Sequence, residues 1–201
     1  DDLAAEAIWL GRALAELLPD EPEVHGLLAM MLLHDSRREA RLSDGELVLL
    51  GDQDRSRWNT EQITAGRDKL RRALALRGRG PYVLQAAIAS AHAEMPCDWA
   101  QIAALYGELT RLTGSPVVEL NRAIAIAETD GPEAGLRIVD QLGLDDFRYL
   151  HSTRAELLRR LGRIGEARDA FRRARHLTAD GAERRFLERP LTELEDTTGS
   201  G

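Results

Sequence analysis

Apolar residues recur every three or four positions along most of this chain, which is the spacing of one face of an α-helix. A first helix is predicted over residues 3–17, because leucine and alanine keep this spacing until Pro19 interrupts it. Its apolar face holds Leu3, Ala7, Leu10, Leu14 and Leu17. A second helix is predicted to start at residues 20–22. Its inward-facing residues are predicted to be Val24, Leu27, Leu28, Met31 and Leu32. The short turn between the two helices predicts a helical hairpin.

Capping residues mark eight further helices and bring the predicted total to ten. Asn59 precedes Gln62 by three residues, the spacing of a helix cap, and the helix that follows is predicted to run to about residue 76. A proline, a glycine or a capping side chain opens each later helix. The predicted starts lie near Pro81, Asp98, Ser115, Gly131, Asp145, Gly162 and Ala182. The pattern predicts no strand.

Small and aromatic residues repeat in the second half with the spacing of a tetratricopeptide (TPR) motif. The set is Ala155, Gly162, Ala167, Phe171 and Ala174, at offsets of 7, 5, 4 and 3 residues. Small residues let two helices approach closely, and the aromatic ring fills the wedge between them. The spacing recurs from Ala123 and, more weakly, from Ala87. We therefore predict an all-α fold of antiparallel helical hairpins in a TPR-like right-handed array; the alternative is an irregular helical bundle.

The helical pattern disappears between about residues 34 and 58. A loop of this length inside a compact helical protein is uncommon, and it is usually functional or packed as an element of its own. We therefore divide the chain into three parts. They are a helical hairpin with a long ordered loop over residues 3–58, TPR-like repeats with a capping helix over 59–195, and a disordered tail over 196–201.

Composition agrees with a helical fold and narrows the classes of partner. The chain has 32 leucines and 28 alanines against 14 valines and isoleucines combined, too few β-branched residues for a β-sandwich or a parallel α/β sheet. A net charge of −7 disfavours direct nucleic-acid contact or attachment to an anionic membrane. A single cysteine, Cys97, excludes an internal disulfide framework and fits a reducing cytosol. No apolar run is long enough to span a membrane, so we expect a cytoplasmic protein.

Catalytic motifs are weak in this sequence. His92, Glu94, Pro96 and Cys97 follow part of the zinc-deaminase signature, but Ala100 stands where the second cysteine is required. We found no glycine-rich phosphate loop and no nucleophile elbow. We therefore predict no enzymatic activity, no catalytic residue, no cofactor and no metal. The remaining enzymatic alternative is a helical site around His34, Asp35, Asp52 and Asp54.

The segment at residues 51–58, GDQDRSRW, is the most informative part of the loop. It combines carboxylates, guanidinium groups and an indole, which either pin the loop to the helices or form a rigid docking surface. We predict that Trp58 is largely buried and that an arginine here pairs with a neighbouring carboxylate. The expected pairs join Arg55 or Arg57 to Asp52 or Asp54. A second charged and apolar segment, on the last predicted helix, contains Arg184, Arg185, Phe186 and Leu187.

Several stretches of the chain resemble the C-terminal extension of one group of bacterial extracytoplasmic-function (ECF) RNA polymerase sigma factors. The longest are residues 26–37, GLLAMMLLHDSR, and residues 45–58, GELVLLGDQDRSRW. Shorter ones are GPY at 80–82, DW at 98–99, SPVV at 115–118 and ERRFL at 183–187. The resemblance covers essentially residues 3–195, and the loop motif is its most specific part.

The resemblance implies a regulatory, protein-interaction function. In that family the extension is TPR-like, follows two sigma regions that bind DNA and polymerase, and takes over control that other such factors delegate to an anti-sigma protein. The implied partners are therefore the sigma core regions and RNA polymerase. The candidate contact residues are Asp52, Asp54, Arg55, Arg57, Trp58, Arg184, Arg185, Phe186 and Leu187. The alternative is a free-standing TPR adaptor that binds a peptide or protein partner in its concave groove.

Overall fold

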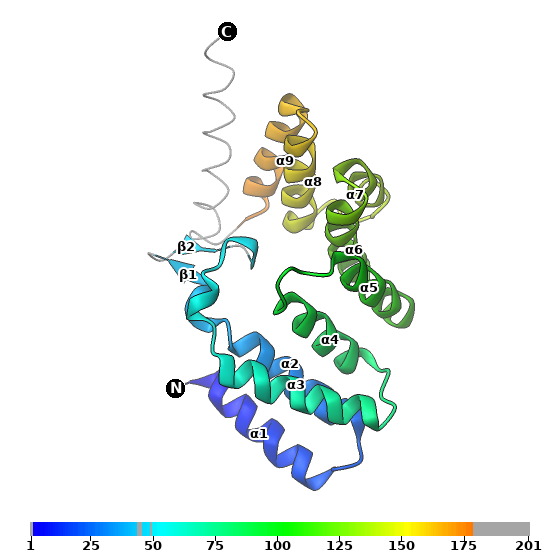
Figure 1. The fold of residues 1–201 in the computed structure, drawn as a ribbon. Helices are drawn as coiled ribbons and strands as arrows, with labels where there is room; N and C mark the ends of the chain where they lie inside the picture. Colours follow the sequence, from blue (N-terminus) through cyan, green and yellow to red (C-terminus); the bar gives the residue numbers. More distant parts are fainter. Residues whose placement is uncertain (1, 44–45, 49, 179–201) are drawn as a thin grey trace. The chain divides into compact units, whose positions relative to one another are not determined.

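A computed structural model of the chain describes residues 2–43, 46–48 and 50–178, and these residues are mostly helical (Figure 1). The helices within these ranges are α1 (Leu3–Leu17), α2 (Pro22–Asp35), α3 (Thr60–Ala75), α4 (Pro81–His92), α5 (Trp99–Thr113), α6 (Pro116–Thr129), α7 (Pro132–Val139), α8 (Arg148–Arg160) and α9 (Ile164–His176). They confirm the predicted all-α class, although α8 begins three residues later than predicted and the short strands at 42–43 and 46–47 were not predicted. The tenth predicted helix, from Ala182, and the predicted tail at 196–201 lie outside the described residues.

Contacts divide the chain into two compact units. The first contains α1–α5, and the second contains α6–α9 with a short pair of strands, β1 (Leu42–Ser43) and β2 (Glu46–Leu47). This division differs from the predicted boundary at residue 58. The reason is that α2 packs against α3 and α4 as well as against α1, which joins the helices on both sides of the loop into one unit.

Helix α2 lies at the centre of the first unit. Leu28 and Leu32 are at most 1% exposed, as their inward direction predicted. Gly26 faces the start of α4, where a Cβ atom would come within 2.7 Å of the backbone nitrogen of Val83. A glycine at this crossing therefore allows α2 and α4 to approach backbone to backbone.

Helix α1 packs on α2 through a face that sequence analysis did not select. Its buried residues are Ile8, Gly11 and Ala15. The leucines of the predicted apolar face remain exposed, Leu3 by 75% and Leu17 by 78% of their surface. This face is therefore not the one that packs on α2. Because α1 rests mainly on one neighbour, the small residue Gly11, which faces the Met31 side chain, determines the contact face instead of the leucine spacing.

The second unit confirms the TPR-like spacing at the level of single residues. Ala155, Ala167 and Ala174 are fully buried where α8 and α9 pack together, and Phe171 fills the space between them at 4% exposure. Gly162 forms the turn with a φ of 73°, a left-handed conformation that favours glycine. The upstream copy behaves alike, since Ala123 is buried and a Cβ on Gly135 would come 2.7 Å from its carbonyl oxygen.

The connection between α2 and α3 folds back on itself. The backbone N–H of Asn59 donates to the carbonyl oxygen of Ser36 at 2.8 Å, so the two ends of this connection meet. Three short 3₁₀ turns lie along it: η1 (Arg38–Ala40), η2 (Leu50–Asp52) and η3 (Arg55–Arg57). We refer to residues 36–59 as the closed loop. The order predicted for the whole loop stays a prediction.

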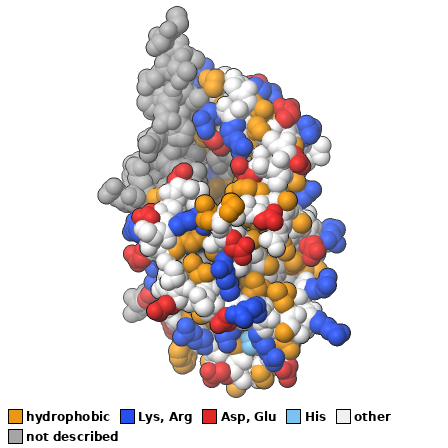
Figure 2. All heavy atoms as spheres, in the orientation of Figure 1, with side chains coloured by type: hydrophobic (Ala, Val, Ile, Leu, Met, Phe, Trp, Pro, Cys, Tyr) orange, Lys and Arg blue, Asp and Glu red, His pale blue; other side chains and the backbone are white. Residues whose placement is uncertain are grey.

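Charged side chains of both signs are interspersed among apolar ones on the face shown in Figure 2. Arginines also pair with carboxylates along single helices, such as Arg122 with Glu119 at 2.6 Å and Arg159 with Glu156 at 2.7 Å. Pairs of this kind on a helix surface contribute a few tenths of a kcal/mol each, about 0.3–0.5. They keep this surface mixed in charge.

Candidate functional site

The segment at residues 51–58 divides into buried anchors and exposed charges. Gln53 and Trp58 are buried, Trp58 with only 6% of its surface exposed. Asp52, Asp54 and Arg57 are exposed. The prediction that Trp58 is largely buried is confirmed. Its indole therefore supports the closed loop from inside, and contact with a partner is left to the exposed charges around it.

The predicted arginine–carboxylate pairs do not form within this segment. Asp54 caps η3 instead: one carboxylate oxygen accepts from the backbone N–H of Ser56 at 2.9 Å and from its hydroxyl at 2.7 Å. These bonds lower the pKa of Asp54. Arg55 extends away from it and donates to the carbonyl oxygen of His92 at 3.1 Å. The tight 3₁₀ turn separates the two side chains, which is why neighbours in sequence do not pair here.

Arg55 links the closed loop to the C-terminal end of α4 and to the segment just before α5. Its guanidinium lies 4.6 Å from the centre of the Trp58 ring, within cation–π range, and a second nitrogen is 3.8 Å from the sulfur of Cys97. His92, the last residue of α4, packs edge-on against Trp99 at 5.5 Å. Arg55 thus holds a loop motif against two helices that follow it by more than thirty residues.

A second arginine approaches Trp58 from the opposite end of the closed loop. The guanidinium carbon of Arg37 lies 5.7 Å from the centre of the Trp58 ring, and one of its nitrogens is 3.0 Å from Nδ1 of His34. Arg41 donates to the backbone carbonyl of His34 at 2.7 Å. We call the residues gathered here the arginine–histidine cluster. Its members are His34, Arg37, Arg41, Arg55 and His92, and all of them belong to the first unit.

Partial burial and like charge depress the pKa values of three cluster members, His34, His92 and Arg37. Desolvation, followed by the cations of Arg37 and Arg41, lowers the pKa of His34 to about 4. Desolvation, followed by Arg37 and Arg55, lowers the pKa of His92 to about 4. Both imidazoles are therefore neutral at pH 7, and His34 Nδ1 accepts a hydrogen bond from Arg37. The pKa of Arg37 itself falls to about 10, again from desolvation first and then from Arg41.

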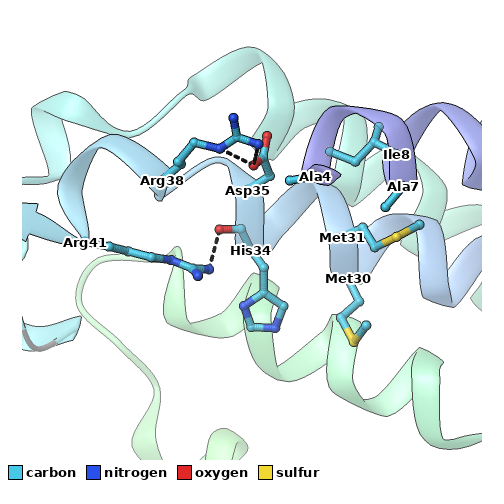
Figure 3. A pocket seen from close by; sticks show the side chains of 9 residues that line it. All are labelled: Ala4, Ala7, Ile8, Met30, Met31, His34, Asp35, Arg38 and Arg41. Atoms are coloured by element: carbon cyan, nitrogen blue, oxygen red, sulfur yellow. Dashed lines mark hydrogen bonds and ion pairs between the residues drawn. The ribbon is translucent and has the colours of Figure 1, made fainter. Parts of the chain in front are cut away.

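An open pocket adjoins the cluster. It has a volume of about 300 Å³ and lies where α1, α2 and η1 meet (Figure 3). Ala4 and Ile8 of α1 form its apolar side, and His34, Arg38 and Arg41 form its polar side. In Figure 3 the His34 ring points away from α1. His34 and Arg41 are exposed, so the cluster is accessible from solvent along this side.

The other candidate residues have structural partners or lie outside the described part. Asp35 accepts hydrogen bonds from Arg38 at 2.8 Å and from Gln62 at 2.7 Å, which ties α2 to α3. Among the described residues, no three His, Cys, Asp or Glu side chains gather in a way that could hold a metal ion. The second predicted contact segment lies outside the described residues. It consists of Arg184, Arg185, Phe186 and Leu187.

Sequence reasoning missed most of the arginine–histidine cluster. Arg37 occurs in one of the stretches that carry the resemblance, but nothing in its local pattern distinguishes it from the other arginines of the chain. His92 was considered only for metal chemistry. The one local signal was Trp58 with Arg55, and the residues that complete the cluster come from segments that only tertiary folding brings together.

No helix within the described ranges is long and apolar enough to cross a membrane.

Comparison with known proteins finds a family match and a curated relative, and the family match covers part of the chain. Residues 1–74 match the model of a family of unknown function, DUF6596, and this range includes α1, α2 and the closed loop. The chain is 46% identical over 200 residues to "Uncharacterized protein R00370" of Rhizobium meliloti (strain 1021). That match covers 96% of this chain and 47% of the relative, so the chain spans about half the length of the curated protein it matches.

Proposed function

We propose that this chain is the cytoplasmic, non-enzymatic regulatory domain of a bacterial ECF-type sigma factor. It would modulate transcription initiation by contact with the sigma core regions or with RNA polymerase. The resemblance of residues 26–37 and 45–58 to the C-terminal extension of such factors is the basis of the proposal. The greater length of the R. meliloti relative is compatible with a domain that operates within a longer protein.

The division of the 51–58 segment into anchors and exposed charges is the structural observation that supports this function best. Buried Trp58 and half-buried Arg55 fix the position of the segment on the helices. The neighbouring side chains of Asp52, Asp54 and Arg57 are exposed to solvent, on a segment that these two anchors hold in place. Charges held in this way give specificity and fast association, because little side-chain and loop entropy is lost on binding.

A reporter assay with the full reading frame that encodes this chain tests the proposal. The double variant Asp52→Asn, Arg57→Ala removes two exposed charges and leaves both anchors in place. We expect a loss of promoter-driven transcription while circular dichroism and thermal melts of the domain stay unchanged. The matched control is Arg12→Ala, Glu16→Gln on the exposed side of α1, which removes the same two charges elsewhere.

Two results would separate the explanations. Transcription that is equal in the docking variant and the control argues against a contact through this segment. Loss of activity that follows loss of helical content assigns the segment to the scaffold. The variant Arg185→Ala, Phe186→Ala tests the second predicted contact in the same assay.

The alternative function is that of a TPR adaptor, and the packing of α8 against α9 favours it. Their small–aromatic–small contact is the packing expected between the two helices of one TPR unit, and such units stack into extended concave binding surfaces. Affinity capture with the intact protein distinguishes the two functions. Recovery of RNA polymerase subunits supports the sigma-factor function. Recovery of a different partner that binds saturably, without polymerase subunits, supports the adaptor.

A further inference from the structure

The three arginines of the arginine–histidine cluster, Arg37, Arg41 and Arg55, have no acidic partner among the described residues. Across the parts of the chain that the structure describes, no carboxylate forms an ion pair with Arg37, Arg41 or Arg55; the pairs that do form involve other arginines. Examples of such pairs are Arg38 with Asp35, Arg122 with Glu119 and Arg160 with Glu128.

The surroundings of Arg37 are unfavourable for an isolated cation. Its guanidinium faces a neutral imidazole on His34, and desolvation, followed by the positive charges of Arg41 and, more weakly, Arg55, lowers its pKa. Like charges in a partly desolvated place repel, and desolvation alone disfavours the charged form. A bound anion would offset the repulsion between these positive charges.

We propose that the arginine–histidine cluster binds a phosphoryl group, as inorganic phosphate or as a phosphate monoester. The cluster offers three guanidinium groups as hydrogen-bond donors. The planar guanidinium group of arginine matches the geometry of phosphate oxygens. A phosphate dianion also neutralises more of the positive charge of three arginines than a single carboxylate does.

The cluster is held in place before any ligand arrives. Trp58 packs against the guanidinium groups of both Arg37 and Arg55, at 5.7 and 4.6 Å from its ring centre. Hydrogen bonds to backbone carbonyls at the ends of α2 and α4 fix Arg41 and Arg55. Fixed donors lose little freedom on binding, which favours affinity. The exposed side of His34 and Arg41, beside the open pocket, provides the approach.

Thermal unfolding of the whole chain in inorganic phosphate tests the proposal, against sodium chloride and sodium acetate at equal ionic strength. We expect phosphate to raise the melting temperature beyond both salts in a saturable way. In Arg37→Gln, loss of a charge-assisted hydrogen bond should weaken phosphate binding about tenfold or more. Without phosphate this variant should melt at the same or a higher temperature than wild type, because repulsion is relieved. The matched control is Arg79→Gln, an exposed arginine on the turn before α4.

The outcomes are distinct. A phosphate-specific shift that Arg37→Gln loses and Arg79→Gln keeps supports the site. Equal shifts in phosphate and chloride overturn it, and equal shifts in acetate and phosphate overturn the choice of a phosphoryl group. A lower melting temperature of Arg37→Gln in the absence of phosphate, with an unchanged phosphate shift, assigns Arg37 to the scaffold and also overturns the site.

Two further probes identify the source of the phosphoryl group. Phosphoserine represents a phosphorylated protein, and glycerol 3-phosphate represents a small metabolite. Binding of either one, lost in Arg37→Gln, supports the site and names its source. The site does not depend on the sigma-factor proposal, since phosphate binding is measured without polymerase and transcription is measured without added phosphate.

Discussion

The side chain of Glu23 in α2 accepts a hydrogen bond of 2.9 Å from the backbone N–H of Tyr82, at the start of α4. Its other carboxylate oxygen accepts from the N–H of Val83 at 3.3 Å. Helix α4 begins after Gly80, which has no side chain to cap these N–H groups. Pro81 occupies the first position of the helix. A carboxylate from another helix therefore performs the capping and also meets the positive end of the helix dipole.

The first prediction concerns this cap between helices. Glu23→Ala should lower the free energy of unfolding by about 1 kcal/mol, the usual value for a lost helix cap. Glu21→Ala is the control, because Glu21 is exposed and forms no side-chain cap at the start of its own helix. Chemical denaturation followed by circular dichroism measures both. Equal losses in the two variants would show that the Glu23 bonds add nothing to stability.

The second prediction compares two tryptophans in different surroundings. Trp58 is 6% exposed and Trp9 is 66% exposed. Trp58→Ala should lower the free energy of unfolding by about 3–5 kcal/mol, as for other large residues lost from a core. Trp9→Ala should change it by no more than about 0.5 kcal/mol, as for an ordinary surface position. Urea titrations of the two variants decide the matter, and a small effect at Trp58 would contradict its role as the anchor of the closed loop.

The third prediction uses opposite effects within α9. Ala167 is fully buried between α8 and α9, so Ala167→Leu should overpack the contact at a cost of about 1–3 kcal/mol. Gly165 is exposed, and a Cβ there meets no other atom within 4 Å. Gly165→Ala should therefore stabilise the helix by about 0.5–1 kcal/mol. Thermal melts should move in opposite directions; a stabilised Ala167→Leu variant would refute the TPR-like packing.

The fourth prediction follows from the depressed pKa values of His34 and His92. Each falls from an ordinary value of 6.5 to about 4 in the folded chain. As the pH drops below 6.5, the unfolded chain takes up protons on these side chains and the folded chain does not. The free energy of unfolding should therefore decrease as the pH falls from 6.5 towards 4.

Variants separate this effect from the general action of acid. His92→Gln should reduce the loss of stability between pH 7 and pH 5, measured by urea titration at each pH. Exposed His176→Gln serves as the control and should keep the wild-type pH dependence. An identical slope in wild type and His92→Gln would mean that His92 titrates normally in the folded state.

Local chemistry in the sequence was sufficient to place the helices. Ser115 caps α6 and Asp98 caps α5, each through a side-chain bond to a backbone N–H two or three residues into the helix. The turn glycine Gly162 and the buried Ala167 and Phe171 were also predictable, because their spacing follows directly from how two adjacent helices pack. Such features depend on residues that are close in the chain. A single sequence contains all the information they need.

Tertiary structure decided which faces are buried and which charges meet. The leucine spacing of α1 predicted a core face, yet Gly11 determines the contact because only a small residue lets the Met31 side chain approach. Arg55 was expected to pair with a neighbouring carboxylate, and it bonds instead to the carbonyl of His92, thirty-seven residues further along the chain. Hydrogen bonds and charges act over a few ångströms in space. Which groups come within that distance is fixed only when separate helices pack together, so the arginine–histidine cluster exists in the fold and in no single segment of the sequence.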